Sequence, residues 1–354
     1  MKPLSQLVRP NIRALRPYST ARDEYAGGEC AGSAVETWLD ANENPFENGI
    51  NRYPDPHQRA LKALIAELKD VDAGRIFLGN GSDEAIDLAF RIFCRPGLDN
   101  AVSIAPTYGM YRVAAATNDV QMREVPLGAG YSLPVGALLA AADERTKLIW
   151  LCSPNNPTGN AFPAQEIESL LRRFDGIVVL DEAYMDFTDD EADYSLAKRL
   201  DEFPNVIISR TFSKSFGMAG LRLGYAIVPE ELADHYWRVR LPFSVNLMAE
   251  EAGIAALQDV AFHDETVRVV REGRAWLTGE LTKLGCRVFP SQSNFLMFEL
   301  PADGPNAASL FEDLLRRGII LRPLTSYGLP RNLRVSVGTA EENTMLINAM
   351  RELL

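Results

Sequence analysis

The chain has 354 residues, 47% of them hydrophobic and 24% charged, and its formal net charge at pH 7 is −12. This composition predicts a globular protein, and the length exceeds one ordinary core, which favours two unequal domains. The acidic balance argues against a nucleic-acid surface, and no apolar stretch approaches the length of a membrane span.

Cysteine and histidine supply little of the expected chemistry. The four cysteines, Cys30, Cys94, Cys152 and Cys286, show no CxxC pairing and are typical of reduced thiols in a cytoplasmic protein. Three histidines are a poor supply for a metal centre or a Ser-His-Asp triad. Chemistry must therefore rest on lysine, carboxylate and tyrosine.

Prolines interrupt the basic N-terminal segment, so we do not expect a transit peptide.

Short apolar runs alternate with helical patterns between residues 75 and 230. We expect strands at residues 76–78, 101–104, 147–152, 177–181, 206–209 and 223–228. Residues 83–93 carry an apolar stripe broad enough for a helix packed on a sheet. The alternation predicts an α/β fold with a mostly parallel sheet, in which ligands bind beyond the carboxyl ends of the strands.

The pattern changes beyond residue 245. Long helices are expected at 248–257 and 264–284, followed by strands that alternate between apolar and polar residues, as at 333–337. This pattern is typical of a smaller α+β domain. We expect three parts: an N-terminal arm (1–38) packed on the smaller domain or on a partner subunit, a large domain (39–245) and a small C-terminal domain (246–354).

A lysine and an aspartate follow two of the expected strands. Lys214 lies in the run 210–216 after one strand, and Asp181 ends the apolar run 177–181. Taken alone, Lys214 would be interpreted as a solvated loop lysine, and Asp181 as a helix cap or a structural salt bridge. Together they suit a carbonyl cofactor with a basic ring nitrogen, because the amine can form a Schiff base and the carboxylate can keep the ring protonated. The pair predicts pyridoxal 5'-phosphate. Glu182 points to the opposite face of its strand and is the weaker candidate.

Residues 78–84 predict a phosphate-binding turn at the start of a helix. Their small residues let backbone amides approach an anion, and the helix N-terminus offers unsatisfied N–H donors. Glu84 replaces the third glycine of a dinucleotide motif, which argues against that class of site. Ser213 and Arg222 could complete the anion site, although each is also typical of an ordinary turn or surface.

The stretch 153–159 follows another expected strand. Two prolines bracket its asparagines and would hold an amide in place to donate to a phenolate oxygen. Tyr108 and Tyr184 also come just after strand ends. Such aromatic residues are more often core residues than cofactor contacts.

Several motifs resemble those of fold-type I aminotransferases. They are SPNNPTG at 153–159, DEAY at 181–184, SKSFGMAGLRLG at 213–224 and RVSVGT at 334–339. Within that family the chain is similar to the histidinol-phosphate aminotransferase subgroup. The segments that carry this likeness are RPNI at 9–12, LDANENP at 39–45, NRYPD at 51–55 and PTYGMY at 106–111. The similar segments span nearly the whole chain in the family's order.

The resemblance implies a role for each matching residue. Lys214 would bind pyridoxal phosphate as a Schiff base and move the proton between substrate and cofactor. The residues implied around the cofactor ring are Asp181, Asn156, Tyr184 and Tyr108. Those implied around its phosphate are Ser82, Asp83, Thr211, Ser213, Arg222 and, from the neighbouring subunit, Tyr53. Those implied to bind substrate are Tyr18, Asn42, Arg322 and Arg334. A homodimer would be needed for a complete site.

The activity implied is reversible amino transfer between L-histidinol phosphate and 2-oxoglutarate, in histidine biosynthesis. Two other enzymes remain open: an aromatic or dual-specificity aminotransferase, and a pyridoxal-dependent phospho-amino-acid decarboxylase. The same lysine and aspartate would serve all three. A cofactor-sensing regulator is the alternative from another class, but it needs a DNA-binding segment that we do not expect in this acidic chain.

Overall fold

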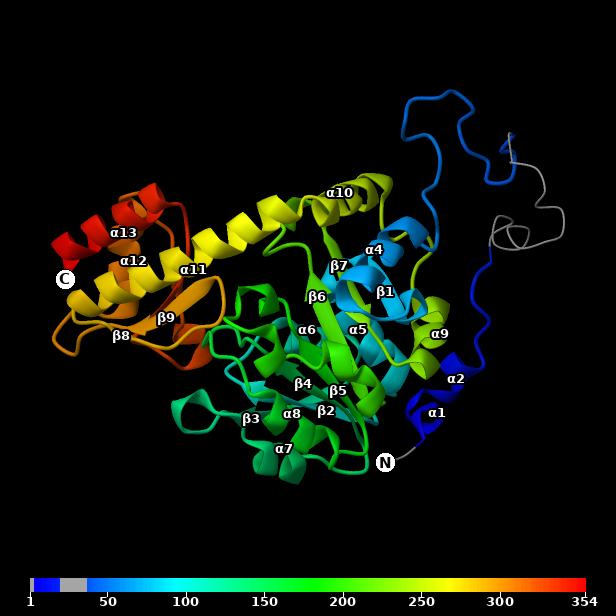
Figure 1. Ribbon diagram of the computed structural model, residues 1–354. Helices are drawn as coiled ribbons and strands as arrows, with labels where there is room; N and C mark the ends of the chain where they lie inside the picture. The colour runs from blue at the N-terminus through cyan, green and yellow to red at the C-terminus, as the bar shows by residue number, and fades with distance from the viewer. Residues whose placement is uncertain (1–2, 20–36) are drawn as a thin grey trace.

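The structure, a computed structural model, describes residues 3–19 and 37–354 and contains two sheets (Figure 1). The larger sheet has seven strands in the order β1-β7-β6-β5-β4-β2-β3, and the smaller has four in the order β10-β11-β9-β8. Across these two ranges, no helix combines the length and the apolar character needed to span a membrane.

The larger sheet is mostly parallel, as predicted. Its strands are β1 (Ile76–Asn80), β2 (Asn100–Ala105), β3 (Gln121–Pro126), β4 (Thr146–Cys152), β5 (Ile177–Asp181), β6 (Val206–Thr211) and β7 (Leu223–Ile227). Strand β7 alone runs antiparallel to both of its neighbours, β1 and β6. Strand β3 was not predicted, because only Val125 of this edge strand is buried and the strand therefore carries no apolar run.

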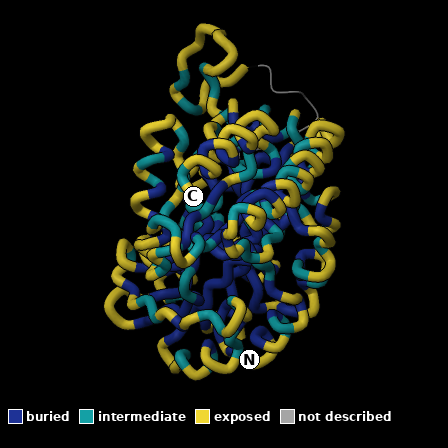
Figure 2. The backbone as a smooth tube through the Cα atoms, turned by 90° about the vertical axis from the view of Figure 1, so that its left-hand side faces the viewer, coloured by how far each residue is buried: buried dark blue, intermediate teal, exposed yellow. Residues whose placement is uncertain are grey.

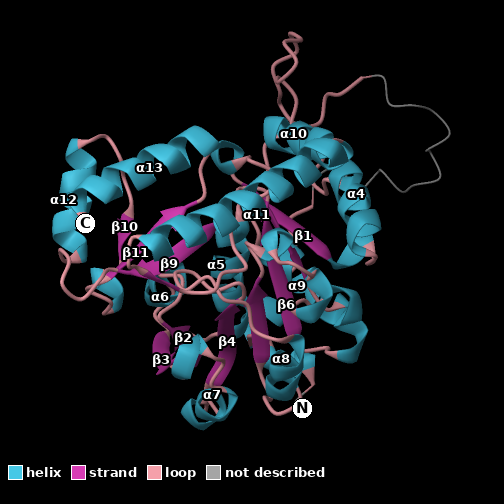
Figure 3. Cartoon of the chain, turned by 60° about the vertical axis from the view of Figure 1, so that its left-hand side comes forward, coloured by secondary structure: helices cyan, strands magenta, loops and turns pink. Residues whose placement is uncertain are grey.

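Helices cover both faces of this sheet (Figure 3). Along β4, Leu148 and Trp150 pack in one core while Ile149 and Leu151 pack in the other, as the two-residue period of a strand requires. The helices of the first core are α5 (Ser82–Phe93), α6 (Met110–Thr117) and α9 (Glu230–Val239). Those of the second are α4 (Arg59–Lys69), α7 (Val135–Ala141), α8 (Ala164–Leu171) and α10 (Leu247–Gln258).

The smaller sheet is antiparallel and has its own core. Its strands are β8 (Arg287–Val288), β9 (Phe295–Glu299), β10 (Arg322–Pro323) and β11 (Asn332–Ser336), and its helices are α11 (Val260–Lys283), α12 (Ala307–Arg316) and α13 (Ala340–Leu353). The predicted alternation on β11 is confirmed, since Leu333 and Val335 are buried and Ser336 is exposed.

Helix α11 belongs to both parts of the molecule (Figure 1). Val267, in its first half, packs in a core of the larger sheet, whereas Leu277 and Leu281 pack in the core of the smaller sheet. The domain limits expected at residues 38 and 245 stay predictions.

The start of the N-terminal arm contacts helices of the larger sheet. Helices α1 (Leu4–Leu7) and α2 (Pro10–Arg13) contact α9, and Ile12 is buried in the same core as α5. The Arg9 amide also donates to the carbonyl oxygen of Ile92, at 2.9 Å. The expectation that the arm packs on the smaller domain is therefore wrong for residues 3–19, because their apolar side chains fill a site beside α5 and α9. Packing on a partner subunit stays a prediction, and residues 20–36 of the arm lie outside the described ranges.

Candidate active site

Parallel strand pairing brings the predicted aspartate and lysine to one edge of the larger sheet. Asp181, the last residue of β5, lies in register with Cys152 of β4 and with Ser209 of β6. Strand β6 continues to Thr211, and the loop that follows carries Lys214. The carboxyl ends of parallel strands form the usual ligand-binding edge of an α/β sheet.

The Asp181 carboxylate is buried and is held by two uncharged donors. The side chain is 3% exposed; the Tyr111 hydroxyl donates to Oδ2 at 2.6 Å, and the Ala183 amide donates to Oδ1 at 3.3 Å. Burial raises the pKa of Asp181 to about 6, and the hydrogen bond from Tyr111 offsets only part of that shift. A protonated pyridine nitrogen would supply the charge that neither donor has, so the residue fits the expected cofactor.

Tyr111 is a site residue that the sequence analysis missed. It lies in the first turn of α6, and its ring stacks on Trp150, with 5.0 Å between the ring centres. It had been noted only as part of the stretch 106–111. The available signal was its spacing of three residues from Tyr108, which places both rings near the end of β2.

Lys214 lies half-buried beside the ring of Tyr184, with Nζ 5.5 Å from the ring centre. Burial lowers the pKa of Lys214, and the nearby Arg334 guanidinium lowers this pKa further, while Asp181 and Asp83 act in the opposite direction. A lowered pKa increases the share of neutral amine, which is the form that attacks a carbonyl group.

The smaller sheet contributes Arg334 to the same place. Its guanidinium donates to Asn156 Oδ1, and Asn156 Nδ2 in turn lies 3.5 Å from the Tyr184 hydroxyl. Arg334 also lies over the ring of Phe295, at 5.2 Å, and Phe295 meets Tyr184 edge-on. Asn156, Tyr184 and Arg334 are therefore brought together where the two sheets approach each other.

The start of α5 forms a narrow turn against β7. Gly81 precedes the helix and has no side chain to cap it, so the amides of Ser82 and Asp83 are available to an anion, while the Glu84 amide donates to the Gly81 carbonyl oxygen. A Cβ atom on Gly224 would lie 2.3 Å from the Ser82 nitrogen, so this backbone approach requires glycine.

The remaining residues predicted around a phosphate meet at this turn. Arg222 Nη1 lies 3.4 Å from Ser213 Oγ, and the Ser213 amide donates to Thr211 Oγ1 at 3.1 Å. Arg222 Nη2 lies 3.2 Å from a carboxylate oxygen of Asp83, whose other oxygen accepts a hydrogen bond from the Tyr108 hydroxyl. These residues fit a bound phosphate, which would share the Arg222 guanidinium with the Asp83 carboxylate.

Four predicted residues are exposed, and of these Arg322 lies next to the site. Tyr18 is 71% exposed, and Asn42 and Arg322 are also exposed. Tyr53 is half-exposed, and its ring stacks on Phe243 at 4.5 Å. Arg322 is the cross-strand neighbour of Arg334 on β10. The roles predicted for these four residues stay predictions.

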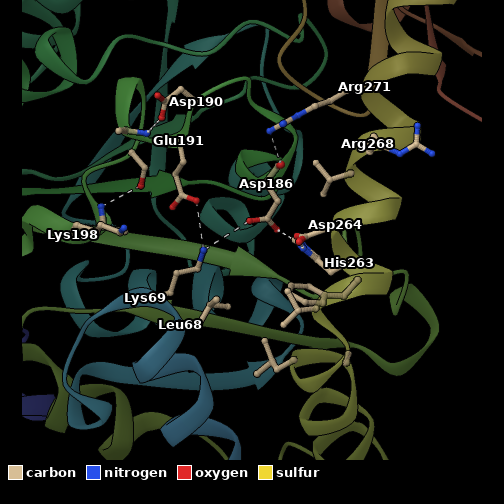
Figure 4. A pocket seen from close by; sticks show the side chains of 18 of the residues that line it. Leu68, Lys69, Asp186, Asp190, Glu191, Lys198, His263, Asp264, Arg268 and Arg271 are labelled. Carbon is tan, nitrogen blue, oxygen red and sulfur yellow. Dashed lines mark hydrogen bonds and ion pairs between the residues drawn. The ribbon is translucent and has the colours of Figure 1, made fainter.

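A cavity of about 770 Å³ adjoins the loop that carries Lys214 but is lined by none of the predicted site residues (Figure 4). Its walls include Lys69, Asp186, Glu191, His263 and Arg271. We do not assign the active site to this cavity, because the groups suited to the expected cofactor converge around Lys214.

The raised pKa of Asp181 predicts how stability depends on pH. The carboxyl group of Asp181 has a pKa of about 6 in the folded state and of 3.8 in the unfolded state. Its contribution to the free energy of unfolding is therefore fully present below pH 3.8 and is lost as the pH rises to 6. We expect the cofactor-free Asp181→Asn variant to gain about 2 to 3 kcal/mol relative to wild type between pH 4 and 6.5, measured by urea denaturation. Asp193→Asn, a surface control, should show no such trend, and a constant difference for Asp181→Asn would contradict the assignment.

Comparisons with known proteins identify the family of the chain. A model of the family described as aminotransferase class I and II matches residues 24–350. A histidinol-phosphate aminotransferase of Bacteroides thetaiotaomicron is 46% identical over 355 residues, which cover 99% of each chain. The solved histidinol-phosphate aminotransferase of Clostridium acetobutylicum has a TM-score of 0.79 and 25% identity, over 86% of this chain and 90% of that one. The enzyme of the same name from Sinorhizobium meliloti, solved in complex with pyridoxal-5'-phosphate, has a TM-score of 0.75 and 26% identity, over 86% of this chain and 84% of that one. The chain belongs to the family of class I and II aminotransferases.

Proposed function

We propose that this enzyme transfers an amino group reversibly between L-histidinol phosphate and 2-oxoglutarate, with pyridoxal 5'-phosphate attached to Lys214. The observation that carries the chemistry is that the half-buried Lys214 amine and the buried Asp181 carboxylate interact electrostatically at one edge of the larger sheet. Support for the substrate comes from the near-complete overlap with a 46% identical histidinol-phosphate aminotransferase.

The cofactor, when bound, withdraws electrons from the α-carbon of the amine substrate. Asp181 would hold a proton on the ring nitrogen, because a buried carboxylate between uncharged donors gains most from a cationic partner. Lys214 Nζ, free once the substrate amine has replaced it on the cofactor, would take the proton from the α-carbon as general base and deliver it as general acid to the cofactor carbon on the other side of the substrate nitrogen. Its lowered pKa suits both steps.

Other residues would orient the cofactor. Asn156 Nδ2 and the Tyr184 hydroxyl lie 3.5 Å apart and could both donate to the ring oxygen. Burial raises the pKa of Tyr184, so its hydroxyl stays protonated as a donor. Tyr108 would stack on the ring. The phosphate would be held by the first amides of α5, at Ser82 and Asp83, and by the side chains of Thr211, Ser213 and Arg222.

The two substrates of the proposed reaction share only their negative charge. Histidinol phosphate carries a phosphate ester and no carboxylate, whereas 2-oxoglutarate carries carboxylates. A guanidinium group binds both anions through paired hydrogen bonds. We assign this part to Arg334, which already reaches Asn156 beside Lys214, with Arg322, Tyr18 and Asn42 as further contacts.

We also propose a homodimer in which each subunit completes the other's site. The segment before α4 extends away from the body of the protein, and its residues are largely exposed (Figures 1 and 2). Leu39 is 89% exposed and Phe46 80%, and the nearby Tyr53 is the residue that would reach the partner's phosphate site. Exposed apolar side chains gathered on one segment are typical of a subunit interface.

A cytoplasmic location belongs to the same proposal. Cys94, Cys152 and Cys286 are free and buried, whereas Cys30 lies outside the described residues. Free thiols suit a reducing compartment.

Loss of Lys214 tests the proposed chemistry. Lys214→Ala should remove the visible absorbance of the attached cofactor and abolish turnover, because no other lysine lies beside Asp181 and Tyr184 in the described part of the chain. Borohydride reduction of the wild type should leave a pyridoxyl group on Lys214, detected by mass spectrometry. Lys283→Ala, a surface control, should behave as wild type. A pyridoxyl group on another lysine would contradict the assignment.

Substrate binding is tested at Arg334. Arg334→Met should lower kcat/KM for histidinol phosphate and for 2-oxoglutarate by about 10- to 100-fold, because each loses charge-assisted hydrogen bonds. Arg287→Met, on an exposed part of the same sheet, is the matched control. Initial rates with phenylalanine and threonine phosphate complete the measurement. A higher kcat/KM for either than for histidinol phosphate would reject the proposed donor.

The shared site is tested with mixed subunits. Tyr53→Phe should weaken cofactor binding about tenfold through loss of one hydrogen bond, and Lys214→Ala should have no attached cofactor. A hybrid of the two variants has one site with Lys214 from one chain and Tyr53 from the other. We expect that site to bind cofactor with wild-type affinity, as measured by absorbance titration of purified hybrids. Weakened binding in the hybrid would show that Tyr53 acts within its own subunit.

A further inference from the structure

A group of charged residues, of which Lys69, Glu182 and Arg210 are buried and Asp186 and Glu191 partly buried, lies next to the loop that carries Lys214, and we name it the ionic cluster. Its members are Lys69, Glu182, Asp186, Glu191 and Arg210. Arg210 is 3% exposed; it lies 2.6 Å from Glu182, 2.6 Å from Glu191 and 3.2 Å from Asp186. Lys69 points between Glu191 and Asp186 at 3.7 and 3.9 Å (Figure 4). Partners of this kind hold a buried carboxylate in one place.

Asp186 connects the ionic cluster to residues 212–218, the loop that carries Lys214, which we name the lysine loop. Its Oδ2 accepts a hydrogen bond of 2.5 Å from the hydroxyl of Ser215, and its Oδ1 is held by Arg210. Ser215 is buried and directly follows Lys214 in the chain. The Gly217 amide donates to the Lys214 carbonyl oxygen at 3.1 Å and closes the turn. The residue that follows Lys214 is thus hydrogen-bonded to a carboxylate that the ionic cluster holds in place.

Helix α11 meets the same loop from the other side. The His263 ring lies against the ring of Phe216, with 4.5 Å between ring centres, and His263 Nε2 is 3.8 Å from Asp186 Oδ2. Figure 4 shows Asp186 between Lys69 and His263. Asp186 and Phe216 therefore confine Ser215 between the ionic cluster and α11.

We propose that Asp186 is a positioning residue that fixes the backbone at Lys214 through the hydroxyl of Ser215. The inference rests on the proposed role of Lys214 as the cofactor-binding lysine. A lysine side chain has four rotatable bonds, so the place its amine can reach depends on where the backbone is anchored. Small displacements of a reacting group cost much of the rate. If the ionic cluster only stabilised the fold, losing any of its hydrogen bonds should have a similar effect on the reaction. If Asp186 positions Lys214, only the loss of its hydrogen bond with Ser215 should lower the rate.

The chain provides a matched control for this difference. The Ser195 hydroxyl also donates to a carboxylate of the ionic cluster, Glu182 Oε2, at 3.0 Å, but Ser195 is not part of the lysine loop. We expect Ser215→Ala to lower kcat about tenfold with KM changed less than about twofold, because only the placement of Lys214 is altered. Ser195→Ala should keep kcat within about twofold of wild type.

A measurement without cofactor separates positioning from loss of bound cofactor. Lys214 in the cofactor-free protein can be labelled with an amine-reactive reagent at a series of pH values and quantified by mass spectrometry. Burial lowers the pKa of this amine, so a loosened loop should move the midpoint of labelling upward, by about half a pH unit or more, as water reaches the amine. The midpoint of Ser195→Ala should match that of wild type.

A double variant tests the link to Asp186 itself. In an Asp186→Ala background, which removes the acceptor of this hydrogen bond, the Ser215→Ala change should lower kcat by less than about twofold, because the two side chains act through one hydrogen bond. Equal effects of Ser215→Ala and Ser195→Ala on kcat and on the labelling midpoint would overturn the inference. So would a full effect of Ser215→Ala in the Asp186→Ala background. A wild-type enzyme with no pyridoxyl group on Lys214 after borohydride reduction would instead reject the proposed function.

Discussion

The parallel pairing of β5 with β6 is the constraint on which the rest of the site depends. It sets Asp181 in register with Ser209 and places the loop of Lys214 just beyond the end of β6. Paired strands lie about 4.8 Å apart, so the two groups cannot separate unless the sheet opens. Side chains alternate along β6, so consecutive residues face opposite sides of the sheet. Thr211 lies on the side of the site, and Arg210 lies on the side of the ionic cluster.

Burial of Asp181 without a charged partner sets the electrostatics of the site. A carboxylate between the hydroxyl of Tyr111 and a backbone amide loses hydration that these donors only partly replace. The cofactor-free protein carries this cost as reduced stability near neutral pH. The cost is recovered when a cation binds, so the same burial that weakens the empty fold strengthens the hold on a protonated ring.

The positions of three candidate residues could be predicted from the ends of apolar strands. Lys214, Asp181 and Asn156 each lie at or just beyond the end of such a strand, as expected, and their chemical roles stay predictions. The fold class followed from the same strands, except for the polar edge strand β3. Tyr111 was missed because a tyrosine in the first turn of a helix looks like any core aromatic until its hydroxyl is seen on Asp181.

The ionic cluster escaped prediction for a different reason. Its acidic members are spread from residue 182 to 191, and they meet only because the loop after β5 turns back on Arg210. That path depends on tertiary packing and has no periodic signature. The roles of Tyr53 and Tyr18 are harder still, since one folded chain does not place the residues that a second chain would meet.

Helix α11 gives the two halves of the site a common support. One end brings His263 to Asp186 and Phe216, next to the lysine loop, and the other end packs in the core beneath the strand that carries Arg334. A continuous helix of 24 residues has little freedom to bend unless its hydrogen bonds are broken. The position of the arginine that would bind substrate and the position of the lysine that would move the proton are therefore set by the same element, although the two residues lie 120 positions apart in the sequence.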